Sequence, residues 1–404
     1  MSHPARFVAA LAVLAAIPIV ASPALGAGRS YYEVVSATAY ELPTLGGSES
    51  VANDVNNNGQ IVGWSVNTFG VKNAFLIQAS GSIQNVGIAV SDEESSAESI
   101  NANAEVVGYF VRSRERPFYW HASSGFFKMS VLLLPDETYG DEYDLRPYAI
   151  NDHGLIVGAG YNLAAGHYPQ LCERNVPVYW TTPTADPRIL FCMGEWWQLT
   201  AATDVSNSGW ISHFHESAND DRAYRHAFPF GSYNVPDAAS GLDSLHMWGV
   251  NESGVVVGDV ERDSVSNLEF TQMAYYWNGT STFPKTIAPF AGGNRAVAFD
   301  VNEQNFVVGY GEKNMPVLGD PSMGERAFIW HEEFGRYELP TPSGWQAIVA
   351  KCRAHALNDL YTGPRGDMHL RVVGYCQKKN GPKQAVRWAV AIGTTSTPPI
   401  SSAN

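Results

Sequence analysis

Hydrophobic and polar positions follow a twelve-residue pattern that recurs along the chain. In the first copy, residues 52–63, small or apolar residues alternate with polar ones, a polar Asn-Gly segment follows, and Ile61-Val62-Gly63 restores apolar character. Alternation on both sides of a short polar segment predicts two β-strands joined by a tight turn. The other copies occupy residues 97–108, 147–158, 202–213, 247–258, 298–309 and, with an insertion after Asn358, 354–374.

The turn inside each copy has its own chemistry. An asparagine near the middle can accept the backbone N–H two residues on, which favours a turn; these residues are Asn56, Asn101, Asn151, Asn251, Asn302 and Asn358. Three residues later stands a type that tolerates positive φ, namely Gly59, Gly154, Gly209, Gly254 or Asn305. The second copy has Ala104 there, so we expect a strained or different turn.

A shorter aromatic phrase follows each copy and predicts a third strand. The phrases lie at residues 74–76, 117–120, 177–180, 226–228, 274–277, 327–330 and 385–388. Segments such as 82–86 and 336–339 predict a fourth strand. Four antiparallel strands repeated seven times indicate an all-β fold, a seven-bladed β-propeller. An open or two-domain β array is the alternative.

The two ends of the repeat region complement each other. The last copy lacks a clear fourth strand after residue 392, whereas a spare strand, residues 31–42, precedes the first copy. If the N-terminal strand completes the last blade, the ring closes and leaves no large open edge. We therefore expect a propeller of residues 27–393, closed by its N-terminal strand.

The first and last residues differ in composition from the repeats. Residues 1–26 hold Arg6, an apolar run and then small residues, which predicts a signal peptide and a secreted or periplasmic protein. Residues 394–404 are rich in Ser, Thr and Pro and are expected to be disordered. No later segment is apolar enough to predict a membrane span.

Charge and motif content narrow the function classes. The formal net charge of -14 argues against nucleic acid and anionic membranes as partners. No nucleophile elbow, zinc-protease, phosphate-loop or dinucleotide motif is present. We expect a monomer without a metal or other cofactor. Residues 54–59 are superficially similar to a calcium loop, but the other copies lose the carboxylates, which favours a simple turn.

The paired phrases resemble the HAF-repeat family of exported bacterial proteins, named for a His-Ala-Phe motif that stands here at residues 226–228. The resemblance covers residues 44–388 and implies an extracellular or periplasmic β-repeat protein. It implies no established activity. Most copies replace the histidine, with Asn73, Arg116, Met273, Arg326 or Gln384.

Propeller geometry places the long, irregular segments on one face, opposite the asparagine turns. All four cysteines are expected at that loop-rich face. Pairing of neighbours, Cys172 with Cys192 and Cys352 with Cys376, fits the geometry of a disulfide most simply. The alternative is that the cysteines are free and buried.

Basic residues at the ends of predicted strands should also reach the loop-rich face, where variable loops on a rigid scaffold carry function. Such cations suit a carboxylate- or sulfate-bearing ligand, such as an acidic polysaccharide. The alternative is that they pair with the acidic segment at residues 136–144. The candidate ligand-binding residues are Arg146, His213, His215, Arg295, Arg353 and His355, with His226 and Arg326 expected to begin third strands.

A catalytic alternative rests on fold analogy. Some polysaccharide lyases, including ulvan lyases, are seven-bladed propellers that transfer protons with His and Tyr and neutralise a carboxylate with Arg. This chain could supply His226, His246, Tyr310 and Arg326. Repeat equivalents of Tyr310 and Arg326 leave ordinary packing as an equal explanation. A metal site of His213, His215 and His226 is a further alternative to packed histidines.

Overall fold

The computed structural model describes most of the repeat region. The described residues are 30–88, 93–132, 144–161, 175–190, 199–216, 222–228, 232–234, 244–262, 271–281, 283–314, 324–345 and 349–396. Within them every regular element is a β-strand, so the fold is all-β, as the sequence predicted. The expected signal peptide, residues 1–26, lies outside the described residues.

Within the described residues, five sheets contain four antiparallel strands each, paired in chain order. They are β2 (Gly46–Val55), β3 (Ile61–Asn67), β4 (Lys72–Ile77) and β5 (Ile83–Asn85); β6 (Glu94–Ile100), β7 (Val106–Val111), β8 (Glu115–His121) and β9 (Gly125–Lys128); β10 (Asp144–Ile150), β11 (Ile156–Tyr161), β12 (Asn175–Trp180) and β13 (Arg188–Ile189); β14 (Leu199–Val205), β15 (Trp210–Glu216), β16 (Arg222–Ala227) and β17 (Ser232–Asn234); and β18 (Ser244–Val250), β19 (Val256–Arg262), β20 (Thr271–Trp277) and β21 (Lys285–Ile287).

In the described part of the chain, a further sheet of nine strands contains the last two sequence repeats and the N-terminal strand. A single parallel pair, Glu325 opposite Lys351, joins its two parts. The first part is β22 (Ala296–Val301), β23 (Val307–Lys313), β24 (Gly324–His331) and β25 (Gly335–Glu338); the second is β26 (Val349–Leu357), β27 (Tyr361–Thr362), β28 (Met368–Lys378), β29 (Lys383–Thr395) and β1 (Tyr31–Glu41).

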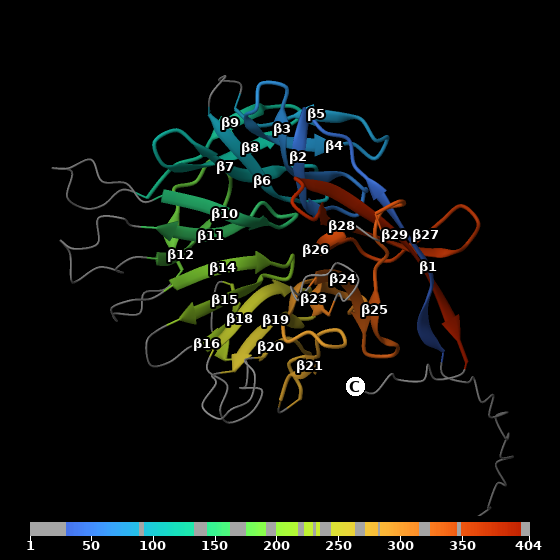
Figure 1. The fold of residues 1–404 in the computed structure, drawn as a ribbon. Helices are drawn as coiled ribbons and strands as arrows, with labels where there is room; N and C mark the ends of the chain where they lie inside the picture. The colour runs from blue at the N-terminus through green and yellow to red at the C-terminus, as the bar shows by residue number, and fades with distance from the viewer. Residues whose placement is uncertain are drawn as a thin grey trace, which may run out of the picture.

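The N-terminal strand pairs with the C-terminal one. β1 runs antiparallel to β29, with Tyr31 opposite Thr395 and Glu41 opposite Val386. In Figure 1 the two strands lie side by side, blue against red. This is the pairing that the sequence predicted. β29 extends to Thr395, past the boundary expected at residue 393, and residues 397–404 lie outside the described part.

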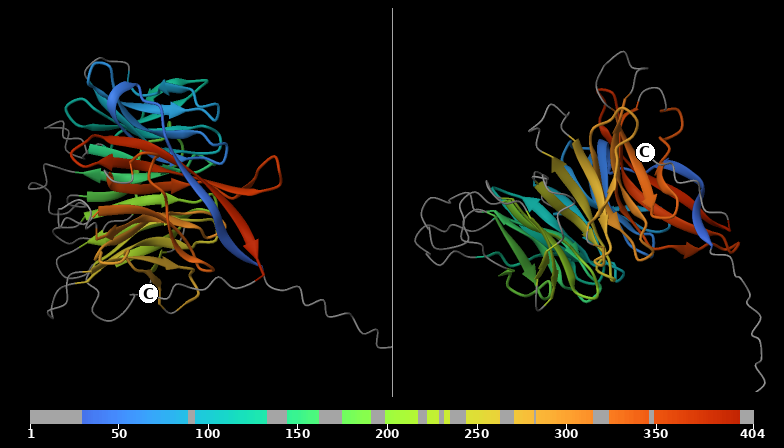
Figure 2. Two further views of the ribbon diagram at one scale, coloured as in Figure 1. Left: turned by 45° about the vertical axis from the view of Figure 1, so that its right-hand side comes forward. Right: turned by 90° about the horizontal axis from the view of Figure 1, so that it is seen from below.

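The sheets are arranged around a common axis (Figures 1 and 2). The first strand of each repeat contacts the first strand of the next, and β26 contacts β2. We number the repeats 1 to 7 by these first strands, β2, β6, β10, β14, β18, β22 and β26. The arrangement is β-propeller-like.

The core lies between neighbouring sheets. One buried cluster, for example, joins Val62 and Leu76 of repeat 1 to Ala97 and Val106 of repeat 2. The paired backbones approach closely at the end of the twelve-residue pattern, where a Cβ on Gly63 would collide with the carbonyl oxygen of Val51. Glycine at this position is therefore a requirement of the strand pairing.

Each first strand carries an irregularity of register at the second residue of the twelve-residue pattern. A bulge leaves its residue outside the ladder and redirects the side chain. Some of these side chains cross to the next repeat: Asn53 donates to the Ala97 carbonyl at 2.8 Å, and Thr203 to that of Met247 at 2.7 Å. The bulge residues are Asn53, Glu98, Tyr148, Thr203, Trp248, Phe299 and His355.

Repeat 4 departs from the expected register. His213 takes the place of the glycine and lies opposite Tyr224, as Gly63 lies opposite Phe75. β16 begins at Arg222, and His226 is its penultimate residue. The prediction that His226 begins a third strand was wrong. The hydrogen-bond ladder places Tyr224 opposite His213, so the third strand begins four residues before the His-Ala-Phe motif.

Candidate functional site

The candidate site lies at the end of the axis where the first strands begin, which we call the channel mouth; the name refers to this position alone. In each repeat, the residue just before the twelve-residue pattern pairs with a residue of the second strand, as Val51 pairs with Trp64 in repeat 1. Five repeats have an aromatic residue there: Trp64, Tyr109, Phe214, Tyr310 and Tyr375. Together with the bulge residues they surround this end of the axis.

Aromatic rings form a continuous wall along repeats 4 to 7. The ring of Phe214 lies 5.5 Å from that of Trp248, and Trp248 lies 6.2 Å from Phe299. Phe299 contacts both Tyr310 at 5.8 Å and His355 at 5.6 Å. Because Trp248, Phe299 and His355 are only partly buried, the wall offers a surface on which a flat or apolar ligand face could pack.

Repeat 5 replaces the aromatic residue with Asp259, whose side chain is 1% exposed. Three side chains satisfy this buried carboxylate. His246 Nδ1 lies 3.0 Å from Oδ2, Trp248 Nε1 donates to Oδ1 at 2.5 Å, and Gln272 Nε2 donates to Oδ2 at 2.6 Å. Asp259 thereby fixes two rings of the channel mouth and one amide.

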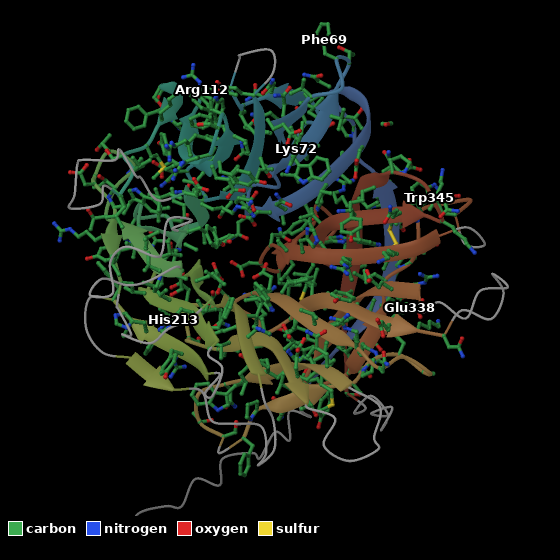
Figure 3. All side chains as sticks on the ribbon, turned by 60° about the vertical axis from the view of Figure 1, so that its left-hand side comes forward. Phe69, Lys72, Arg112, His213, Glu338 and Trp345 are labelled. Atoms are coloured by element: carbon green, nitrogen blue, oxygen red, sulfur yellow. A yellow bond between two sulfur atoms is a disulfide. The ribbon has the colours of Figure 1, made fainter. Side chains whose placement is uncertain are left out.

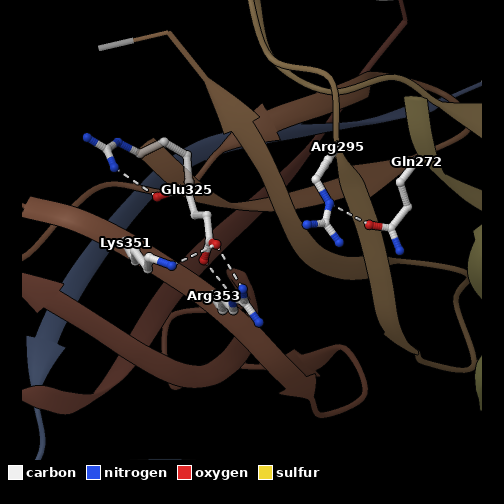
Figure 4. Close-up of polar contacts among 6 residues, drawn as sticks. Gln272, Arg295, Glu325, Lys351 and Arg353 are labelled. Atoms are coloured by element: carbon white, nitrogen blue, oxygen red, sulfur yellow. Dashed lines mark hydrogen bonds and ion pairs between the residues drawn. The ribbon is translucent and has the colours of Figure 1, made fainter. Parts of the chain in front are cut away.

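Gln272 in turn orients a cation. Its Oε1 accepts a hydrogen bond of 2.9 Å from Nε of Arg295, which Figure 4 shows. The Arg295 side chain is exposed, and among the described residues its two terminal nitrogens have no hydrogen-bond partner. A guanidinium held at Nε with free terminal nitrogens is oriented to bind a carboxylate or sulfate.

Arg353 lies in the next repeat and is already paired. It holds Glu325 through two hydrogen bonds, of 2.6 and 2.8 Å, and Lys351 Nζ lies 3.2 Å from the same carboxylate (Figure 4). Burial alone would raise the pKa of Glu325, but the hydrogen bonds and charges of Arg353 and Lys351 lower it below its usual value. The Arg353 guanidinium also lies 4.1 Å from the ring centroid of Tyr310.

The same arrangement occurs between repeats 2 and 3. Arg146 lies 4.1 Å from the ring centroid of Tyr109 and bonds Glu115, with Nε 3.1 Å from Oε2. Arg146 therefore has a carboxylate partner on a neighbouring third strand. This pairing favours a contact between sheets over a ligand-binding role.

Of the residues predicted from the sequence, six lie at the channel mouth: Arg146, His246, Arg295, Tyr310, Arg353 and His355. His355 lies with Nδ1 3.0 Å from the Ala52 carbonyl oxygen. Burial lowers the pKa of His355 to about 4, so the ring is neutral at neutral pH. Burial also raises the pKa of Tyr310, which keeps its hydroxyl protonated.

The other predicted residues do not join this group. Arg326 is 3% exposed, donates to the Glu325 carbonyl and lies 3.7 Å from Glu338 of β25. His213 is 2% exposed and stacks on Tyr224 at 5.1 Å (Figure 3 labels His213 and Glu338). His226 lies at the far end of β16. His215 belongs to β15, and its side chain lies outside the described part.

Sequence reasoning missed Asp259 and Gln272. A signal for Asp259 exists in the repeat pattern, because a carboxylate stands where most copies have an aromatic residue. Gln272 has no such signal, since its partners come from two different repeats.

One of the two expected disulfides is present. Cys352 and Cys376 lie opposite each other on β26 and β28 and are bonded, which confirms this pairing. They adjoin Arg353 and Tyr375 in sequence and so brace the channel mouth. Cys172 and Cys192 lie outside the described residues.

The opposite end of the axis holds a cavity of about 180 Å³, lined by the turn ends of the first strands of all repeats. Its carboxylates, Asp152, Glu252, Glu303 and Asp359, accept backbone N–H bonds from preceding repeats. These bonds between repeats indicate that the four carboxylates have a structural role. In the described part of the chain no group of three or more His, Cys, Asp or Glu side chains could hold a metal ion, and no helix could span a membrane.

No protein-family model matches the chain, and neither does any curated protein sequence. Among solved structures, virginiamycin B lyase from Staphylococcus aureus is similar over 87% of this chain and 99% of its own, at 9% identity and a TM-score of 0.47. The Aleuria aurantia lectin is similar over 75% of this chain and 100% of its own, at 12% identity and a TM-score of 0.38. A Dyadobacter fermentans protein of unknown function is similar over 90% of this chain and 99% of its own, at 11% identity and a TM-score of 0.40. These likenesses are too distant to indicate an activity.

Proposed function

We propose that the chain is an exported seven-bladed β-propeller, closed by β1, that binds an acidic glycan at its channel mouth. Seven sequence repeats, the closed series of contacts among first strands and the pairing of β1 with β29 support the fold. The disulfide between Cys352 and Cys376 supports an oxidising compartment.

The observation that carries the binding proposal is the orientation of Arg295. Gln272 holds its Nε and leaves both terminal nitrogens available within the described part of the protein. Arg353 and Lys351 add positive charge one repeat away, only partly offset by Glu325. A carboxylate or sulfate would receive charge-assisted hydrogen bonds from Arg295.

The aromatic wall supports a saccharide as the bearer of that anionic group. Sugar rings present C–H faces that pack on aromatic side chains, while their hydroxyls need polar partners. Trp248 and Phe299 offer the first, and Tyr310 offers a hydroxyl for the second. A uronic acid or a sulfated sugar combines both features.

The test is a glycan array, followed by titration calorimetry with an oligogalacturonate and a heparin-derived oligosaccharide. Arg295→Ala should weaken binding about tenfold or more, since a hydrogen bond to a charged group contributes about 1.5–3 kcal/mol. Arg112→Ala removes an exposed arginine that pairs with Glu93 and serves as the control. Equal loss in both variants, or no binding to any acidic glycan, would contradict the proposal.

A second candidate is a polysaccharide lyase, favoured by the contact between His246 and Asp259. A carboxylate that orients an imidazole prepares it to act as a general base. Tyr310 could then donate a proton to the leaving oxygen, and Arg295 could stabilise the charge on the substrate carboxylate. This assignment replaces His226 and Arg326, which lie away from the mouth.

The lyase candidate predicts an unsaturated product from uronic-acid polysaccharides, detected by its ultraviolet absorbance. His246→Gln and Tyr310→Phe should each abolish product formation while the protein still binds the glycan. Binding without product in the unmodified protein would contradict the lyase candidate and leave the glycan-binding proposal standing.

A further inference from the structure

Three cations at the channel mouth have no carboxylate ion pair within the described residues. They are Arg295, Lys383 and Lys72. Their neighbours Arg353, Lys351 and Arg146, by contrast, pair with Glu325 or Glu115. In a chain with a net charge of -14, unpaired cations gathered at one end of the axis need an explanation.

The three cations belong to consecutive repeats. Arg295 precedes β22 of repeat 6, Lys383 begins β29 of repeat 7, and Lys72 begins β4 of repeat 1. Because β22 contacts β26 and β26 contacts β2, these repeats are adjacent around the axis. The cations therefore form an arc, one per repeat, which we call the basic arc. Figure 3 labels Lys72.

Each lysine of the basic arc is accompanied by an aromatic ring. Lys383 Nζ lies 5.1 Å from the ring centroid of Tyr375. Lys72 Nζ lies 4.7 Å from that of Trp64 and 3.2 Å from the Tyr109 hydroxyl oxygen. Aromatic faces hold an ammonium group in place without neutralising it, so it can still bind an anion.

The positive charges of Arg353 and Lys383 both act on His355. Burial has the largest effect on the pKa of His355, and the charges of Arg353 and Lys383 lower it further. His355 in turn packs on Phe299 of repeat 6 and on Tyr375 of repeat 7. The basic arc and the aromatic wall therefore border each other.

We propose that the basic arc binds an extended polyanionic saccharide, with successive acidic residues at repeats 6, 7 and 1. This rests on the proposed binding function and specifies the form of its ligand. Facing sheets pack about 10 Å apart, so a single carboxylate cannot reach the cations of three repeats. A linear chain with an acidic group on each residue or disaccharide can do so.

The experiment measures how affinity depends on ligand length. Oligogalacturonates from the dimer to the octamer supply carboxylates, and heparin-derived oligosaccharides of matched length supply sulfates. The unmodified protein should bind hexamers at least about tenfold more tightly than dimers, because the longer chain engages the second and third cations without a new bimolecular step. Whichever series shows this dependence identifies the anionic group.

The double variant Lys72→Ala/Lys383→Ala should remove the length dependence and leave dimer affinity, which depends on Arg295, unchanged. Lys128→Ala is the matched control, because Lys128 Nζ lies 5.0 Å from the ring centroid of Phe110 and belongs to the outer strand β9. It should keep the full length dependence. Melting curves establish that all variants fold.

The outcomes separate the two proposals. Length-independent binding that still requires Arg295 would overturn the basic arc and leave the glycan-binding proposal standing. Absence of binding by every acidic glycan would overturn both. Tight binding of polyglutamate, with no binding of either saccharide series, would overturn the assignment to a saccharide.

Discussion

Asn57 and Asp359 are 302 residues apart in sequence and exchange two hydrogen bonds. Asn57 Nδ2 donates to Asp359 Oδ2 at 2.8 Å, and the backbone N–H of Asp359 donates to Asn57 Oδ1 at 2.8 Å. The pair joins repeat 7 to repeat 1. Residues at equivalent positions join other repeats. The Ala102 N–H donates to Asp152 between repeats 2 and 3, and the Glu303 N–H donates to Asp359 between repeats 6 and 7.

A second series of contacts runs one residue earlier in the turns of repeats 1, 2, 3, 5 and 6, whereas repeat 4 has Ser206 at this position. Asn56 Nδ2 donates to the Asn101 carbonyl at 2.9 Å, and Asn302 Nδ2 to the Asn358 carbonyl at 3.1 Å. Within the described residues the Nδ2 atom of Asn358 is buried without a hydrogen-bond partner. In the described part of the chain the second series is therefore interrupted between repeats 7 and 1, as it is between repeats 4 and 5, and the bonds of Asn57 with Asp359 join repeats 7 and 1.

Asn57→Ala should accordingly destabilise the fold by about 1–2 kcal/mol, through loss of two hydrogen bonds of about 1 kcal/mol each. Asn58→Ala is the control: it removes one bond, to the Ala102 carbonyl, between repeats 1 and 2. Urea denaturation measures the free energy of unfolding of both variants. A double-mutant cycle of Asn57→Ala with Asp359→Ala that shows no coupling would contradict direct pairing.

Ala104 occupies the left-handed region, with φ of 61°. The turn thus keeps the conformation of the other repeats, most of which have glycine here, and it is strained. A non-glycine residue in this region costs about 1 kcal/mol. Ala104→Gly should stabilise the protein by about 0.5–1 kcal/mol in urea denaturation. Ala102→Gly, at a residue outside that region, should instead destabilise it.

The sequence predicts local and periodic features better than contacts between repeats. Turn asparagines, strand pairs and the partner of β1 follow from alternation and repetition, and the structure has them. The site depends on neighbours in different repeats: Asp259 belongs to repeat 5, while Arg295, joined to it through Gln272, belongs to repeat 6. Neither spacing nor composition encodes such contacts. His226 shows the converse, because a recognisable motif there pairs at the end of β16, with His226 opposite Ile211, and not at the start of the strand.

Three aspartates near the axis bear on how stability depends on pH. Each accepts a backbone N–H from the next repeat, Asp54 from Ile100, Asp204 from Val250 and Asp300 from Leu357. Burial raises the pKa of Asp204 to about 7, and repulsion by Asp54 adds to this effect. The pKa values of Asp54 and Asp300 are raised in the same direction, chiefly by burial.

The folded protein therefore binds more protons than the unfolded chain between the ordinary aspartate pKa of 3.8 and about 7. Stability falls as pH rises through this window, so the melting temperature should be higher near about pH 5 than near about pH 8. Asp204→Asn should flatten this dependence, whereas Asp186→Asn, at an exposed position, should leave it unchanged. A melting temperature that rises over the same interval would show that other groups dominate.

The disulfide between Cys352 and Cys376 joins residues separated by 24 positions. Closing a loop of this length stabilises a fold by about 3 kcal/mol through the entropy of the unfolded chain. Cys352→Ala/Cys376→Ala should lower the free energy of unfolding by about that amount, as measured by urea denaturation. The double variant should also weaken glycan binding, because Arg353 and Tyr375 adjoin the bond; unchanged affinity would show that the sheet holds them without it.

Removal of β1 tests whether the N-terminal strand closes the fold. Beyond its pairing with β29, Tyr32 packs on Phe306 and His331, with ring centroids 5.2 Å apart in each case. The Tyr32 N–H also donates to Glu333 Oε2 at 2.6 Å, which ties β1 to repeat 6. A chain that begins after Glu41 should therefore expose the edge of β29, lose cooperativity and melt well below the unmodified protein. The control begins at Ser30 and keeps all of β1. If the two truncated chains melt at the same temperature, β1 contributes nothing to closure, and the contacts of β26, β28 and β29 with β2 hold the ring.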